Sequence, residues 1–122
     1  MKLSEKQRIF TRNIARLIEY AYDTGIELTF GEAYRTIDQQ WLYYNGYEIR
    51  GRELVKAKKR SWTMQSKHLD RLAVDFNFFI DGELTYDKDI LYQLGEYWES
   101  LNENNEWGGF WTQTDTPHFQ MS

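Results

Sequence analysis

The stretch "RLAVDFNFFIDG", residues 71–82, carries the strongest secondary-structure signal in the chain. Every second residue is apolar, which places one set of side chains on a single face of an extended backbone: Leu72, Val74, Phe76, Phe78 and Ile80. This period of two predicts a half-buried β-strand, and the Asp81–Gly82 pair at its end predicts a tight turn. The other face carries Asp75, a carboxylate that needs a partner when it is enclosed. We therefore expect a central strand that presents an acid.

Helices are predicted on both sides of this strand. Apolar residues recur at helical spacing from Ser4 to Ala21, and Gly25 is the expected stop. The segment "DKDILYQLGEYWESLNEN", residues 87–104, shows a second apolar stripe with the same spacing. Both segments have a hydrophobic face that needs to be buried against the strand.

Shorter segments complete the predicted fold. Residues 26–35 read as a strand that runs into a turn, residues 36–46 as a helix, and residues 117–121 as a last strand after a glycine turn. Residues 46–66 have no clear period, which favours a long loop or a weakly held helix. This order predicts an α+β fold with a small antiparallel sheet flanked by helices. A length of 122 residues with 41% hydrophobic content suits one domain over residues 1–122.

Composition limits the chemistry. The chain has no cysteine, which excludes a disulfide scaffold, a Cys-based metal site and a thiol nucleophile, so any metal must use His and carboxylate ligands. The net charge of −4 argues against broad nucleic-acid binding. Six of the fifteen Lys and Arg residues nevertheless lie in residues 50–60, where a solvated surface is favoured over contact with an anionic wall polymer. The first twenty residues have the features of neither a signal peptide nor a membrane span, so we expect synthesis in the cytoplasm.

Both histidines of the chain lie close to an aspartate in the sequence. His68 precedes Asp75 by seven residues, and Asp115 precedes His118 by three. Catalytic zinc takes three protein ligands of this type and keeps a fourth position for water, so His68, Asp75 and His118 are a candidate set. His68 must then lie in the turn before the strand, and His118 on a last strand beside it. Asp115 is the candidate base.

Simpler interpretations of these residues stay open. A His–Asp pair is most often an ordinary hydrogen bond, and Arg35, our candidate for stabilising an oxyanion, could instead pair with Glu32. Ser66 could cap a turn, and Gln40 could face solvent. We expect Trp107 and Trp111 to cover the core and not to bind ligand.

The motifs together resemble the zinc D-alanyl-D-alanine carboxypeptidase family, which includes VanY-like enzymes and phage L-alanyl-D-glutamate endolysins. The similarity covers residues 32–120, with five motifs in the right order. They are an arginine segment ("EAYRTIDQQ", residues 32–40), Ser-x-His (Ser66 and His68), Ala-x-Asp (Ala73 and Asp75), Trp-Gly-Gly (residues 107–109) and Asp-x-x-His (Asp115 and His118). One departure is Arg71, which stands where many members have glycine. The resemblance implies a hedgehog/DD-peptidase-like fold.

The resemblance also implies roles for these residues. His68, Asp75 and His118 would bind Zn²⁺, Asp115 would be the general base, Arg35 would steady the substrate or the oxyanion, and Ser66 and Gln40 would support the site. The expected partner is a peptidoglycan stem peptide, cut by a monomer that reaches the periplasm or cell wall after release. An aspartate in Asp-x-x-His resembles the endolysin branch and favours L-alanyl-D-glutamate endopeptidase activity. The alternatives are a D-alanyl-D-alanine carboxypeptidase and a non-catalytic, metal-stabilised peptidoglycan-binding domain.

Overall fold

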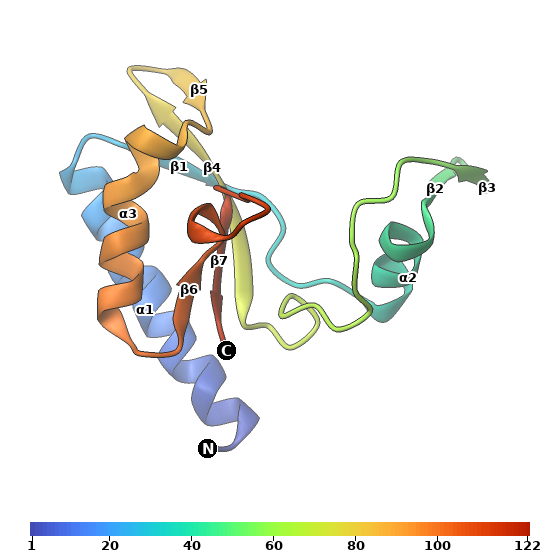
Figure 1. Cartoon of the computed structure of the whole chain (residues 1–122), viewed down its shortest axis with the longest axis horizontal. Helices are drawn as coiled ribbons and strands as arrows, with labels where there is room; N and C mark the ends of the chain where they lie inside the picture. The colour runs from blue at the N-terminus through green and yellow to red at the C-terminus, as the bar shows by residue number, and fades with distance from the viewer.

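Strand β4 (Ala73–Ile80) is the centre of the main sheet in the computed structural model, which describes residues 1–122 (Figure 1). It pairs antiparallel with β1 (Glu27–Phe30), with β5 (Glu83–Thr85) and with β7 (His118–Met121), and β6 (Asn105–Trp107) extends the sheet beyond β7. A short 3₁₀ helix, η1 (Gly108–Phe110), follows β6. The predicted central strand and its antiparallel sheet are confirmed.

Helices α1 (Leu3–Asp23) and α3 (Lys88–Leu101) pack on the sheet as their apolar stripes predict. Asp87 caps α3, and its side chain accepts hydrogen bonds from the backbone N–H groups of Asp89 and Ile90. The buried core unites both helices with β4 and β7 and includes Phe10, Leu17, Leu94, Trp98, Val74, Phe76, Phe78, Phe119 and Met121. No helix combines the length and apolar character that crossing a membrane requires.

Alternation along β4 and β7 separates the core from a polar face. Val74 and Phe76 on β4, and Phe119 and Met121 on β7, point into the core. The residues that alternate with them therefore project from the opposite face of the sheet, away from the helices. Asp75 and His118 belong to this second set, and they are direct cross-strand partners. The face of the sheet that the helices leave open thus carries the acid and a histidine.

Residues 37–60 form an arm that Figure 1 shows set apart from α1, α3 and the main sheet. The arm consists of helix α2 (Ile37–Asn45) and a two-stranded hairpin, β2 (Tyr47–Arg50) and β3 (Glu53–Lys56). The Thr36 side chain caps α2 by accepting a hydrogen bond from the Gln39 N–H, and Gly46 ends the helix with a φ of 75°, a value that favours glycine.

The prediction of a loop or weak helix over residues 46–66 was wrong for the hairpin. Both faces of β2 and β3 have exposed positions, so neither face has to be apolar. The sequence of the hairpin therefore shows no sustained alternation of apolar and polar residues. Strand β6 was also missed, because its three residues are too few to show a period.

Arg71 occupies the turn before β4 with a φ of 56°, in the left-handed region that favours glycine. Its guanidinium carbon lies 4.1 Å from the centre of the Tyr34 ring. A cation–π contact of this kind offsets part of the cost of the backbone conformation. The departure from the family's glycine therefore preserves the turn that carries His68.

We expect Arg71→Gly to change the free energy of unfolding by less than about 1 kcal/mol, because relief of backbone strain is offset by loss of the Tyr34 contact and by a more flexible unfolded chain. Arg71→Val should destabilise the fold by about 2 kcal/mol, since a β-branched residue is strained at positive φ. Urea titration of both variants checks this. Equal stability of the two variants would contradict it.

Candidate metal and catalytic site

Three side chains from distant parts of the sequence converge on the open face of the sheet. His68 comes from the turn before β4, Asp75 from β4 and His118 from β7. His68 Nε2 lies 3.3 Å from Asp75 Oδ2, and His118 Nδ1 lies 3.0 Å from Asp75 Oδ1. One ligand atom from each residue lies within 4.8 Å of the others. The structure therefore brings together the three residues that the sequence predicted as metal ligands.

The second nitrogen of each imidazole ring is already hydrogen-bonded away from this cluster. His68 Nδ1 lies 3.0 Å from the Ala33 carbonyl oxygen, and His118 Nε2 lies 2.8 Å from Gln120 Oε1. Because both partners are acceptors, each of these nitrogens carries the ring proton and donates it. In a neutral ring the nitrogen that faces Asp75 then has no proton, and its lone pair is free to bind a metal ion. Two oriented nitrogen donors and a carboxylate are a donor set that suits a divalent zinc ion.

Charges within the cluster shift two pKa values in opposite directions. Burial alone would raise the pKa of the Asp75 carboxyl, but hydrogen bonds from His118 and His68 outweigh it and hold this pKa well below its usual range. Burial alone would lower the pKa of His118, but the hydrogen bond and the charge of Asp75 outweigh it and raise this pKa. Without a metal ion, the site thus favours an imidazolium–carboxylate pair.

Asp115 lines the same pocket from the loop that follows η1. Its backbone N–H donates to the Gly108 carbonyl oxygen at 2.9 Å, and its carbonyl oxygen accepts from the His118 N–H at 3.2 Å. A side chain at position 108 would place a Cβ atom 2.3 Å from the Asp115 carbonyl oxygen, so only glycine permits this approach. Partial withdrawal from water raises the pKa of the Asp115 carboxyl, an effect that the two histidines oppose and Asp75 supports.

Arg35 forms part of the pocket wall and is held by several neighbours. Its guanidinium pairs with Glu32, as the simpler interpretation predicted, and donates from Nη1 to Gln40 Oε1 at 2.7 Å and to Ser66 Oγ at 3.3 Å. The Tyr43 ring lies beneath it, with the ring centre 4.8 Å from the guanidinium carbon. These contacts fix the position of the guanidinium beside the cluster.

Gln40 and Ser66 both link Arg35 to its surroundings. Gln40 is fully buried, which excludes the simpler interpretation that it faces solvent, and its amide nitrogen donates to Ser61 Oγ at 2.8 Å. Ser66 accepts from the His68 N–H at 3.2 Å, so it caps the turn before β4 as predicted and also receives Arg35. Gln40 therefore lies between Arg35 and the segment that leads from the arm to His68.

The pocket has a volume of about 530 Å³ and contains further polar residues that the sequence did not single out. Arg60 and Lys67 add positive charge to its lining, and Trp111 lies with its ring centre 5.0 Å from that of His118. Trp107 is fully buried, as predicted, whereas Trp111 borders the pocket. Gln120 could have been found from its spacing, because residues two apart on a strand share a face.

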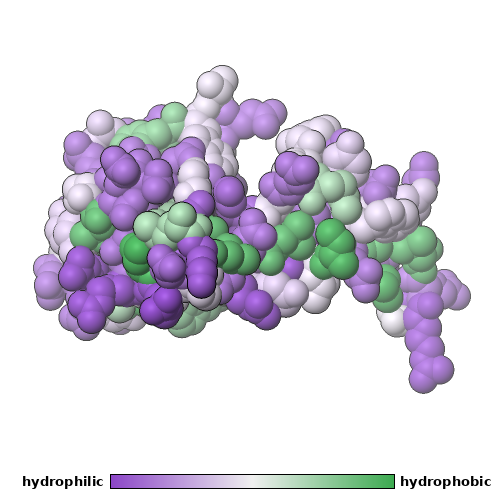
Figure 2. All heavy atoms as spheres, turned by 90° about the horizontal axis from the view of Figure 1, so that it is seen from below, coloured by the Kyte–Doolittle hydropathy of each residue, from purple (hydrophilic) through white to green (hydrophobic).

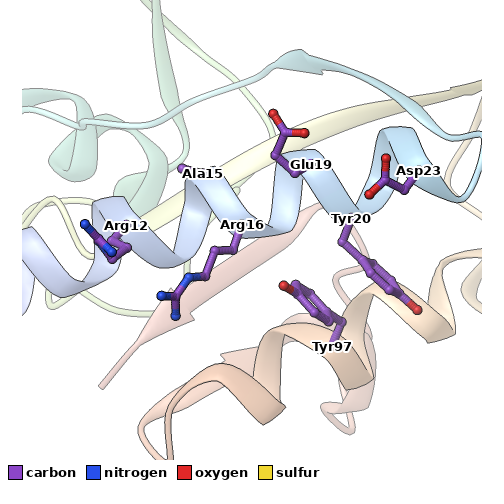
Figure 3. Close-up of a pocket in the computed structure, with 7 residues that line it drawn as sticks. All are labelled: Arg12, Ala15, Arg16, Glu19, Tyr20, Asp23 and Tyr97. Atoms are coloured by element: carbon purple, nitrogen blue, oxygen red, sulfur yellow. The ribbon is translucent and has the colours of Figure 1, made fainter.

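A second cavity of about 470 Å³ lies between α1 and α3 (Figure 3). The rings of Tyr20 and Tyr97 stack there with centres 4.1 Å apart, beside two arginines and two acids whose charges balance. Neither histidine lines this cavity. The candidate chemistry is thus confined to the open face of the sheet.

Comparison with known proteins agrees with this geometry. A family model described as D-alanyl-D-alanine carboxypeptidase matches residues 59–121, which include the three clustered side chains and Asp115. The chain therefore belongs to the D-alanyl-D-alanine carboxypeptidase family, a family of peptidases.

A solved structure shares the fold of the chain. The crystal structure of the Serratia marcescens L-Ala D-Glu endopeptidase ChiX superimposes with a TM-score of 0.67 at 24% sequence identity, and the match covers 98% of this chain and 85% of that one. No curated protein sequence matches the chain significantly. The expected DD-peptidase-like α+β fold is confirmed.

The opposite pKa shifts predict how the thermal stability of metal-free protein varies with pH. The lowered pKa of Asp75 contributes stability above its ordinary value of 3.8, which is lost as the pH falls. The raised pKa of His118 contributes stability below its ordinary value of 6.5, which is lost as the pH rises. The Tm difference between the wild type and Asp75→Asn, measured with a chelator present, should therefore be largest between pH 3.8 and 6.5. A Tm difference that does not decline below pH 3.8 or above pH 6.5 would show that the pair does not carry charge.

Proposed function

We propose that residues 1–122 form a zinc-dependent peptidase domain that hydrolyses peptidoglycan stem peptides, with the bond between L-alanine and D-glutamate as the favoured target. The observation that carries this proposal is the convergence of His68, Asp75 and His118 with the outer nitrogen of each ring already satisfied. A His–Asp pair kept only for stability has no need of a second histidine oriented in the same way.

His68 Nε2, Asp75 and His118 Nδ1 would hold the zinc ion. Bound zinc supplies a Lewis acid that polarises the carbonyl group of the peptide and makes water a nucleophile near neutral pH. The chain supplies the orientation of the donors: the Ala33 carbonyl fixes the His68 ring, and the Gln120 amide fixes the His118 ring. Both histidines are almost fully buried, which limits their motion.

Asp115 is the general base and acid in this proposal. Its carboxylate takes a proton from the attacking water and passes it to the nitrogen of the leaving amine. The raised pKa of Asp115 suits both transfers, because a proton carrier works best when its pKa approaches the pH of the reaction. Gly108 allows the backbone approach that holds this residue in the pocket.

Arg35 steadies the substrate or the oxyanion that develops on the attacked carbonyl group. The guanidinium has five N–H donors, and Glu32, Gln40 and Ser66 engage only some of them. Gln40 and Ser66 act as positioning residues, because they orient Arg35 and reach the substrate only through it. Since Glu32 offsets the charge of Arg35, Arg60 and Lys67 supply the pocket with its remaining positive charge for carboxylates of a stem peptide.

Two substrates are supported by different observations. Aspartate at position 115 resembles the endolysin branch, and the Serratia marcescens protein with the same fold is an L-Ala D-Glu endopeptidase. Together these observations favour the endopeptidase of a phage or prophage. The matched family model is described as D-alanyl-D-alanine carboxypeptidase, which supports removal of a terminal D-alanine as the second candidate. In either case the enzyme would act as a monomer on cell-wall peptidoglycan after its release from the cytoplasm.

Mass analysis of peptidoglycan digested by the zinc-loaded protein tests the proposal and separates the two substrates. We expect stem peptides that begin at D-glutamate. Loss of terminal D-alanine alone would instead assign the carboxypeptidase activity. The Asp115→Asn protein is the blank. If neither product forms although zinc is bound, the proposed activity is overturned and a metal-stabilised binding domain is favoured.

Variants should separate metal binding from proton transfer. Asp115→Asn should keep one zinc ion per chain and lose about 10²–10⁴-fold in kcat, which is the usual contribution of a general base. His118→Ala should lose both zinc and activity, because a catalytic zinc site depends on three protein ligands. Asp70→Asn, an exposed acid in the turn that carries His68, is the matched control and should retain both. Metal analysis and kinetics on the same samples check this, and hydrolysis by chelated protein would contradict it.

A further inference from the structure

The arm carries a continuous row of apolar side chains that the rest of the chain leaves largely exposed. We call it the apolar strip, and it consists of Ile37, Trp41, Tyr47, Ile49 and Leu54. Four of these residues are large and well exposed: Ile37 by 58%, Trp41 by 45%, Ile49 by 62% and Leu54 by 54%. Figure 2 shows hydrophobic residues at the surface of this part of the molecule, away from the main body.

Local geometry makes the strip continuous. Ile37 and Trp41 are four residues apart on α2 and therefore lie on one side of the helix. The Trp41 ring stacks on Tyr47 with centres 5.7 Å apart and an angle of 15° between the planes. Tyr47 and Ile49 share a face of β2, and Ile49 lies directly opposite Leu54 on β3. Helix and hairpin thus present a single apolar surface.

This surface is separate from the catalytic pocket. Gln40 and Tyr43 lie on the side of α2 that faces Arg35 and the segment before His68. With 3.6 residues per turn, Ile37 and Trp41 point from a different side of the helix. None of the strip residues lines the pocket that contains His68 and Asp115. The strip is therefore not explained by the proposed catalytic function.

Positive charge surrounds the strip. Residues 37–60 contain six Lys and Arg against three Asp and Glu, a net charge of +3 in a chain whose total is −4. Arg50 pairs with Glu48 at 2.6 Å, but the exposed side chains of Arg52, Lys56 and Lys58 have no acidic partner. Lys56 lies opposite Tyr47 and so shares the face of the strip. The arm is basic where the rest of the molecule is acidic.

We propose that the apolar strip docks the protein on the surface of an anionic phospholipid bilayer. The aliphatic side chains of the strip would leave water for the boundary of the acyl chains, while Arg52 and Lys56 meet lipid phosphates. Trp41 and Tyr47 have the amphipathic rings that favour the membrane interface. A soluble anionic polymer would satisfy the cations but leave Ile37, Ile49 and Leu54 in water, so the combined chemistry selects a lipid surface.

Docking would also affect the β2–β3 hairpin, which pairs with no strand of the main sheet. A two-stranded hairpin with little packing on either face is only marginally stable in water. Contact of Ile49 and Leu54 with lipid would bury one face of β2 and β3 and hold their register. The docked arm would then be more ordered than the free arm.

Vesicle sedimentation with phosphatidylglycerol and with phosphatidylcholine tests the proposal. The protein should bind phosphatidylglycerol vesicles and bind neutral vesicles much more weakly. The double variant Ile49→Thr/Leu54→Thr keeps strand-forming residues and should bind about tenfold more weakly, because it removes buried apolar area. Leu84→Thr is the matched control, since Leu84 is also on a hairpin and is exposed by 54%, and it should bind like the wild type.

Charge variants test the second half of the interaction. Arg52→Gln/Lys56→Gln should weaken binding to phosphatidylglycerol vesicles, whereas Arg12→Gln, at an exposed position of α1, should not. Circular dichroism confirms that each variant is folded. Hydrolysis of soluble peptidoglycan fragments should be unchanged in the strip variants, so loss of vesicle binding and loss of catalysis are separable.

Three outcomes would overturn the docking proposal. The first is failure of the wild type to bind phosphatidylglycerol vesicles. The second is equal loss of binding in Leu84→Thr and in the Ile49→Thr/Leu54→Thr variant. The third is binding to soluble polyphosphate that matches vesicle binding and is insensitive to the Ile49→Thr/Leu54→Thr change, which would assign the arm to an anionic polymer.

Discussion

The site depends on the antiparallel pairing of β4 with β7, because this pairing sets Asp75 directly opposite His118. Alternation along both strands then sends Val74, Phe76 and Phe119 into the core and leaves the acid and the histidine on the other face. A shift of one residue in this register would exchange the two faces, burying the polar cluster among the helices and exposing aromatic rings. The hydrophobic core thus fixes the geometry of the site.

Hydrogen bonds outside the cluster complete what strand pairing begins. Ala33 lies two residues before Arg35, and its carbonyl group orients the His68 ring, so the segment that supplies the guanidinium also fixes a ligand. On the other side, Trp107 is buried in the core and donates its indole N–H to the Thr116 carbonyl oxygen at 2.8 Å. This bond ties the loop that carries Asp115 to the core. A rigid scaffold therefore surrounds a polar pocket on several sides.

The arm has a different relation to the core. Its base is joined to the pocket through the Gln40 side chain, which accepts a hydrogen bond from Arg35 and donates one to Ser61. The apolar strip on its outer surface is exposed. One helix, α2, therefore turns one side towards the pocket and another towards the surroundings. Peptidase chemistry and attachment to a surface could be varied independently in such an arrangement, because the two sides share few residues.

The sequence by itself determined the elements with strong periodicity, namely the long helices and the central strand, and the residue types of the site, since two histidines and no cysteine leave few ligand sets. It did not reveal the β2–β3 hairpin, because a strand pair exposed on both faces has no apolar period. Only the tertiary structure showed that Gln40 is buried beside Arg35, that Arg71 adopts a glycine-like conformation, and that Ala33 and Gln120 orient the two rings. These facts depend on contacts between distant segments, which local periodicity does not encode.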